Sequence, residues 1–133
     1  MNPKITCLSD QKGRTILSLL AERDLEAVVD LLRAQIEVSE RALFTWSQLR
    51  PEVGIEILLR QPNVQVDAKD TDGRTALSFA ARSGFAAAVR LLVDCGDADV
   101  NSRDEFGATP LLYASTFGHE ATIVFLLQKD AHI

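Results

Sequence analysis

The stretch DTDGRTAL at residues 70–77 returns, loosely rewritten, as DEFGATPL at residues 104–111, which lies 34 residues later. A self-similarity at such a period indicates a stack of one small structural unit. Units of this kind bury their apolar faces against their neighbours and leave one long surface free for binding. The repeated stretch therefore bears on the fold and on the function together.

The match extends in both directions along the chain. At the same offset Gly84 aligns with Gly118 and Leu92 with Leu126, and residues 55–58 align with residues 89–92. An earlier copy appears at an offset of 60, where residues 13–15 match residues 73–75, so the link at about 33–39 is shortened. We predict one domain over residues 1–133, with repeats at about 13–36, 37–68, 69–102 and 103–133.

Each unit begins with the signals of a turn followed by a short helix. Asp and Gly stand at the first and last positions of a type I turn in both stretches. Thr75 and Thr109 then occupy the place of a helix N-cap, and Pro110 suits the first helical position. Gly84 and Gly118 are expected to end these first helices near their C-caps.

A second helix follows in each unit. Val89, Leu92 and Val93 have the i, i+3, i+4 spacing of a buried apolar stripe. In the second copy, Pro51 is expected to open the equivalent helix. The unit is therefore two helices and a turn, which predicts an all-α chain.

The repeats resemble those of the ankyrin family, whose signature is T-P-L-H-x-A at a period near 33. The signature stands here as TALSFA at residues 75–80 and TPLLYA at residues 109–114. Its histidine is replaced by Ser18, Ser78 and Leu112, and Trp46 stands where Ala80 does, which predicts irregular packing in the second repeat. The resemblance implies an ankyrin-repeat solenoid of about four helix-turn-helix repeats joined by β-turn or hairpin loops.

The composition narrows the class of partner and the compartment. The net charge is −5, so neither a nucleic acid nor a membrane surface is an expected partner. Cys7 and Cys95 have no metal or redox spacing, and reduced thiols fit the cytoplasm or the nucleus, which is the predicted location. The longest apolar runs are too short for a membrane span, and we expect a soluble protein.

The chain offers little that would carry a reaction. It contains no P-loop, no GxGxxG, no HExxH and no nucleophile elbow. We predict a structural role for His119, an inert thiol at Cys95, and turn or capping roles rather than calcium binding for Asp67, Asp70 and Asp72. No cofactor and no metal are expected, and the chain is more consistent with a binding protein than with an enzyme.

The family resemblance implies a binding site on the turn tips and the exposed flank of each first helix, which line a concave groove. A solvent-facing Phe106 favours a contact role, whereas core packing is the more frequent role for Phe79 and Tyr113, at positions that lean toward the groove. The arginines among the mapped residues are equally consistent with a solvated mixed-charge face. The mapped residues are Lys69, Thr71, Asp72, Arg74, Arg82 and Ser83 in the third repeat, and Arg103, Glu105, Phe106, Ala108, Tyr113, Thr116 and Phe117 in the fourth.

Two function hypotheses from different classes follow. The first is a non-catalytic protein–protein interaction scaffold that holds a partner along the groove. The alternative is a small-molecule-binding or catalytic variant that uses the groove as a pocket, with Tyr113, Asp72, Arg74 and Trp46 as its best residues.

The last helix adds a hypothesis about assembly. It reads IVFLL at residues 123–127, and Val124 stands where Arg90 does one repeat earlier. A terminal repeat normally has a polar outer face. We therefore expect this face to meet further repeats, a partner or a second copy of the chain.

Overall fold

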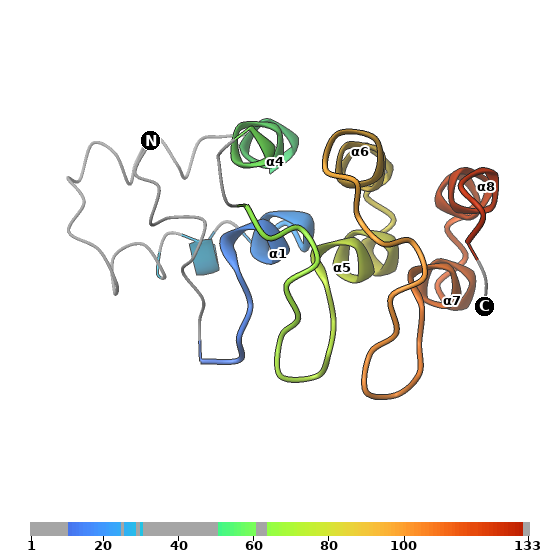
Figure 1. Cartoon of the computed structure of the whole chain (residues 1–133), viewed down its shortest axis with the longest axis horizontal. Coiled ribbons are helices and arrows are strands. Elements are labelled where there is room, and N and C mark those ends of the chain that lie inside the picture. The colour runs from blue at the N-terminus through green and yellow to red at the C-terminus, as the bar shows by residue number, and fades with distance from the viewer. Residues whose placement is uncertain (1–10, 25, 29, 31–50, 61–63, 132–133) are drawn as a thin grey trace.

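The helices stack in two layers, as the computed structural model shows (Figure 1). The structure describes residues 11–24, 26–28, 30, 51–60 and 64–131. The first layer contains α1, α5 and α7, which pack side by side, and the second contains α4, α6 and α8. The helices are α1 Ile16–Ala21, α4 Pro51–Leu59, α5 Ala76–Ser83, α6 Ala86–Arg90, the π-helix η2 Leu91–Cys95, α7 Pro110–Thr116 and α8 Glu120–Gln128.

Each helix of the first layer is started by a threonine. The hydroxyl oxygens of Thr15, Thr75 and Thr109 accept hydrogen bonds from the backbone amides three residues later, at 3.2, 3.3 and 3.2 Å. Such a bond satisfies one of the amides that the first turn leaves without a partner. The predicted N-caps are confirmed, as is the placement of Pro110 in the first turn of α7.

The glycine after α5 lets the next repeat pack closely. Gly84 has a φ of 69°, in the left-handed region that favours glycine. A Cβ at this position would lie 2.4 Å from Nδ1 of His119, whose Nε2 lies 2.8 Å from the carbonyl oxygen of Arg82. His119 thus joins the C-terminal end of α5 in one repeat to the start of α8 in the next, in agreement with its predicted structural role. Gly118 also has a positive φ, as the repeat pattern requires.

The second-layer helices follow the predicted stripe, with one departure. Pro51 opens α4, and Val89 and Leu92 are fully buried, while Val93 is half-buried. The regular helix expected here changes after Arg90 into the π-helix η2. Its wider turn is closed by a bond of 3.1 Å from the amide of Gly96 to the carbonyl of Leu91.

The loops between repeats form hairpins whose tips are tied in a row. Oδ1 of Asp70 accepts hydrogen bonds from the amides of Asp72 and Arg74, both at 2.9 Å. Consecutive tips are joined by backbone bonds, from the amide of residue 71 to the carbonyl of residue 12 at 2.8 Å and from 105 to 72 at 2.9 Å. Asp70 therefore has the predicted turn role. Among the described residues, no group of three His, Cys, Asp or Glu is placed to hold a metal ion.

The outer side of α8 carries exposed apolar residues. Val124 and Leu127 are each 55% exposed, whereas Leu126 is fully buried in the core. The predicted apolar face is present, and what covers it stays a prediction. The predictions for Cys7, for Trp46 and for the shortened link at 33–39 concern residues outside the described part of the chain. Within the described part, no helix is long and apolar enough to span a membrane.

Candidate functional site

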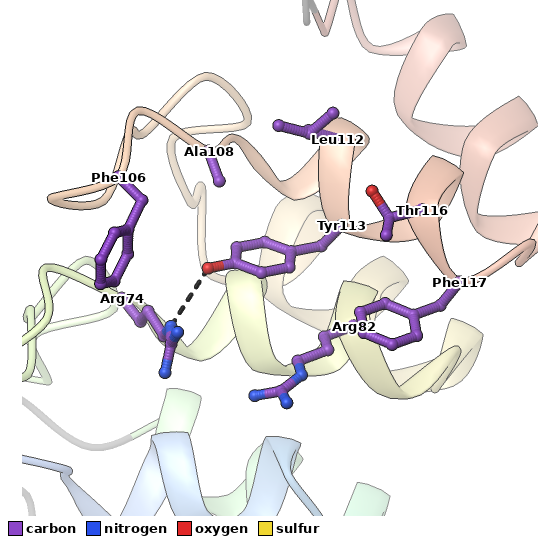
Figure 2. Close-up of a pocket in the computed structure, with 8 residues that line it drawn as sticks. All are labelled: Arg74, Arg82, Phe106, Ala108, Leu112, Tyr113, Thr116 and Phe117. Atoms are coloured by element: carbon purple, nitrogen blue, oxygen red, sulfur yellow. Dashed lines mark hydrogen bonds between the residues drawn. The ribbon is translucent and has the colours of Figure 1, made fainter.

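A pocket of about 450 Å³ lies between the last two hairpins and the first-layer helices α5 and α7 (Figure 2). Its walls combine aromatic rings, two arginines and small side chains. The lining residues are Arg74, Arg82, Phe106, Ala108, Leu112, Tyr113, Thr116 and Phe117.

One face of α7 and one hairpin supply most of the pocket. Leu112, Tyr113 and Thr116 lie on neighbouring turns of α7 on the same side, because residues three and four apart adjoin on a helix. Phe106 stands at the hairpin tip and is 73% exposed, and Phe117 follows the last turn of α7 and is 52% exposed. The two phenylalanines stand at opposite ends, with Tyr113 between them, so the pocket is an open groove (Figure 2).

Three side chains from different parts of the chain meet at the hairpin end of the groove. Nε of Arg74 donates a hydrogen bond of 3.1 Å to the hydroxyl of Tyr113 (Figure 2). That hydroxyl in turn donates to Oδ2 of Asp104. The side chain of Asp104 is fully buried, and its other oxygen accepts the amides of Phe106 and Ala108, both at 2.9 Å. Tyr113 therefore connects the arginine of one hairpin to the carboxylate of the next.

These contacts shift the three pKa values in ways that keep the network in one protonation state near neutral pH. Burial alone would raise the pKa of Asp104, but the Tyr113 hydroxyl, the two amides and the charge of Arg74 lower it overall. Burial and the bond to Asp104 raise the pKa of Tyr113. The bond to Tyr113 is the main cause that raises the pKa of Arg74. Asp104 and Arg74 stay charged, and Tyr113 stays a neutral phenol.

The two arginines of the groove differ in their partners. Arg74 is compensated by carboxylates, since Asp72 lies 3.6 Å from Nη1 and Asp104 lies 3.8 Å from Nε. Arg82 has no ion-pair partner among the described residues, and its guanidinium carbon lies 5.7 Å from the ring centre of Phe117. This distance is within the range of a cation–π interaction. The uncompensated positive charge thus sits at the Phe117 end.

Many of the residues mapped from the sequence come together in this groove, and others do not. Arg74, Arg82, Phe106, Ala108, Tyr113, Thr116 and Phe117 line it. The remaining six, which lie outside its lining, are Lys69, Thr71, Asp72, Ser83, Arg103 and Glu105.

The residues outside the lining have other contacts along the row of tips. Nζ of Lys69 lies 3.2 Å from the carbonyl oxygen of Arg103. Thr71, Glu105 and Asp72 supply the amides and the carbonyl of the bonds between tips. Ser83 is exposed at the end of α5. Binding by any of the thirteen residues stays a prediction.

Phe79 is buried in the core, which is the role that the sequence analysis favoured for it, and it does not line the groove. Leu112 lines the groove but was not among the residues mapped from the sequence, and its equivalent one repeat earlier, Ser78, is buried. The signal that would have found it is its place four residues before the mapped Thr116 on the same helix face.

The comparisons with known proteins agree with this architecture. The family model for ankyrin repeats (3 copies) matches residues 51–133. The chain is 34% identical over 78 residues to chicken (Gallus gallus) inversin, covering 58% of this chain and 7% of that protein. It is 38% identical over 72 residues to human ankyrin repeat domain-containing protein 63, covering 54% of this chain and 19% of that protein.

Two further similarities extend the comparison. The chain is 34% identical over 77 residues to 26S proteasome non-ATPase regulatory subunit 10 of Dictyostelium discoideum, covering 58% of this chain and 33% of that protein. It therefore matches only a minor part of the length of these relatives. A chain in the crystal structure of the yeast ribosomal protein Rps3 in complex with its chaperone Yar1 aligns over all of this chain and 79% of its own, with a TM-score of 0.62 and 21% identity. At that identity the likeness shows the fold.

Proposed function

Because the chain belongs to the ankyrin-repeat family, we propose that it is a non-catalytic scaffold that binds another protein through the groove of its hairpin tips and first helices. Ankyrin repeats generally mediate protein–protein interactions, and a repeat stack leaves an extended concave surface for that purpose. The solved structure with the similar fold is itself a complex between two proteins.

The observation that carries the proposal is the pair of exposed phenylalanines at the two ends of the groove. Within the part of the chain that the structure describes, Phe106 and Phe117 are the most exposed aromatic residues, at 73% and 52%. Exposing such rings to water is unfavourable, and aromatic residues with arginines are the usual anchors of protein interfaces. Arg74 and Arg82 lie beside them, at 5.8 Å from the Phe106 ring and 5.7 Å from the Phe117 ring.

A small-molecule site is the second candidate, and one observation favours it. The pocket volume of about 450 Å³ lies within the range of ligand pockets. The open ends weigh against it, because ligand sites usually enclose most of their ligand. A reaction there is disfavoured as well, since the hydroxyl of Tyr113 is already bonded to Arg74 and Asp104 and its raised pKa keeps it protonated.

The proposal extends to the surroundings of the protein. We place it in the cytoplasm or the nucleus, on the ground that Cys95 is a free, exposed thiol, which suits a reducing compartment. The exposed Val124 and Leu127 on α8 are the surface through which self-association or stacking with further repeats would occur.

Affinity capture from lysate with paired double variants tests the groove. Phe106→Ala/Phe117→Ala removes the two anchors, and Val124→Ala/Leu127→Ala removes two apolar side chains of similar exposure on α8. We expect the first variant to lose the captured proteins, since truncating an interface anchor costs about 2 kcal/mol or more, which is about 30-fold in affinity. The second variant is expected to retain them.

The helical circular dichroism of both variants checks that they fold. Equal recovery of the same proteins by the wild type and the groove variant would overturn the proposal. Loss of recovery only with the α8 variant would move the binding surface to that helix.

A further inference from the structure

The groove has an unequal distribution of charge along its length. At the Phe106 end, the charge of Arg74 is offset by Asp72 at 3.6 Å and by the buried Asp104 at 3.8 Å. At the Phe117 end, Arg82 is exposed and has no acidic partner among the described residues. One end is therefore neutral to acidic and the other is positive.

The space between the two ends is apolar. The ring of Tyr113 forms the floor between Phe106 and Phe117, and Leu112 also lines the groove (Figure 2). The hydroxyl of Tyr113 is occupied by Arg74 and Asp104, so the floor presents carbon atoms rather than a free polar group. An apolar side chain is the group that such a space accepts at least cost.

We propose that the groove binds a short segment of a partner protein in which an apolar side chain lies close in sequence to an aspartate or glutamate. The apolar side chain enters between Phe106 and Phe117, and the carboxylate pairs with the guanidinium of Arg82. This inference rests on the proposed function and specifies the chemistry of the partner.

The charge pattern favours a carboxylate over a phosphate or a nucleic acid. Dianionic phosphates are usually held by clusters of arginines, whereas Arg82 is one uncompensated guanidinium. The half-buried Asp72 and the exposed Glu105 lie on the neighbouring hairpin tips and would repel a larger negative charge. The net charge of −5 also disfavours the binding of a polyanion such as a nucleic acid.

Selection from a random peptide library displayed on phage tests the proposal. The protein is immobilised as the wild type, as Arg82→Gln and as Arg90→Gln. Arg90 is the matched control, because it is an exposed arginine stacked on Phe125 at 5.7 Å, the same distance that separates Arg82 from Phe117. It lies on α6, outside the groove.

We expect the wild type and Arg90→Gln to enrich peptides with an acidic residue close to an apolar one. Arg82→Gln is expected to keep the apolar preference and to lose the acidic one. For an individual enriched peptide made synthetically, Arg82→Gln or replacement of the peptide Glu by Gln should each weaken binding about two- to five-fold, as for an exposed ion pair. The two changes together should weaken it no further.

The other outcomes separate this inference from the proposed function. Peptides that need Phe106 and Phe117 but show no acidic preference, or a phosphoserine peptide that binds when its glutamate counterpart does not, would overturn the inference alone. Peptides that bind without needing the phenylalanines would overturn the groove itself. A failure to enrich any peptide on the wild type would also overturn the inference, because a short segment would then not suffice.

Discussion

Replacing Tyr113 with phenylalanine removes the one hydroxyl that links Arg74 to Asp104, and it should destabilise the chain measurably. The ring itself is expected to fit, because the equivalent position one repeat earlier is a phenylalanine, Phe79. Two hydrogen bonds to charged groups are lost, from Nε of Arg74 at 3.1 Å and to Oδ2 of Asp104.

The expected loss in the free energy of unfolding depends on whether water can take the place of the missing hydroxyl at each of its two partners. Arg74 is about a quarter exposed, so water can solvate its freed donor, whereas the Asp104 side chain is fully buried and its oxygen is left with the more distant Arg74. A buried charged acceptor that loses a donor costs about 1.5–3 kcal/mol. With a urea dependence of about 2 kcal/mol per molar, the unfolding midpoint should fall by roughly 1 M at pH 7.

The same variant should show a defined pH dependence. The pKa of Asp104 is lowered in the folded chain below its ordinary value of 3.8, so its carboxylate adds stability that is fully present above about pH 4 and is lost as the pH falls through the folded pKa. The difference in unfolding free energy between the wild type and Tyr113→Phe should therefore be largest at neutral pH and shrink in acid.

Urea unfolding followed by circular dichroism, at neutral and acidic pH, measures both effects. A double-mutant cycle that combines Tyr113→Phe with Asp104→Asn isolates the interaction between these two side chains. The loss of unfolding free energy in the double variant should be smaller than the sum of the two single losses by at least about 0.5 kcal/mol. Equal midpoints for the wild type and Tyr113→Phe at pH 7, or a difference that grows in acid, would refute the reasoning.

Three further predictions use other parts of the chain. Tyr113 is the single tyrosine, so a pH titration followed at the tyrosinate absorbance band reports its pKa alone. This pKa should lie above the ordinary 10.0 in the folded protein and return to it in concentrated urea. An equal pKa in both states would contradict the burial of Tyr113. Gly84→Ala should destabilise the chain more than Gly118→Ala. Both glycines have a positive φ, at which an alanine costs about 1–2 kcal/mol, but only the Cβ at position 84 would also collide with the imidazole of His119. Urea midpoints in the reverse order would disprove this. Leu126→Ala should cost about 2–5 kcal/mol and Leu127→Ala less than about 1, because only the first is buried, and similar losses in thermal unfolding would argue against the assigned packing of α8.

The sequence was sufficient for the parts of the fold that depend on local chemistry. Thr75 and Thr109 cap helices three residues away, Gly84 takes the left-handed conformation, and Asp70 bonds the amides two and four residues later. Each of these interactions spans only a few residues, so residue type and spacing predict it.

The groove could be predicted only in outline. The link between Arg74 and Tyr113 spans 39 residues, and nothing in the spacing of the two shows that their side chains meet. Phe79 and Tyr113 occupy the same position of the repeat, yet Phe79 is buried in the core and Tyr113 is half-buried and lines the groove. Sequence reasoning treats the repeats as equivalent, whereas exposure depends on the place of each repeat in the stack.

The π-helix η2 has a consequence for how the repeat unit tolerates changes in length. The turn that begins at Asp70 returns at Asp104, 34 residues later, whereas the family period is near 33. A π-turn holds about one residue more than an α-turn, so Leu91–Cys95 can absorb the surplus without lengthening the helix axis. Because that turn lies in the second layer, the surplus is hidden from the hairpins, which keep their spacing along the groove (Figure 1). A change of one residue in the length of the repeat can thus be accommodated in the second layer, while the hairpins keep their positions relative to one another.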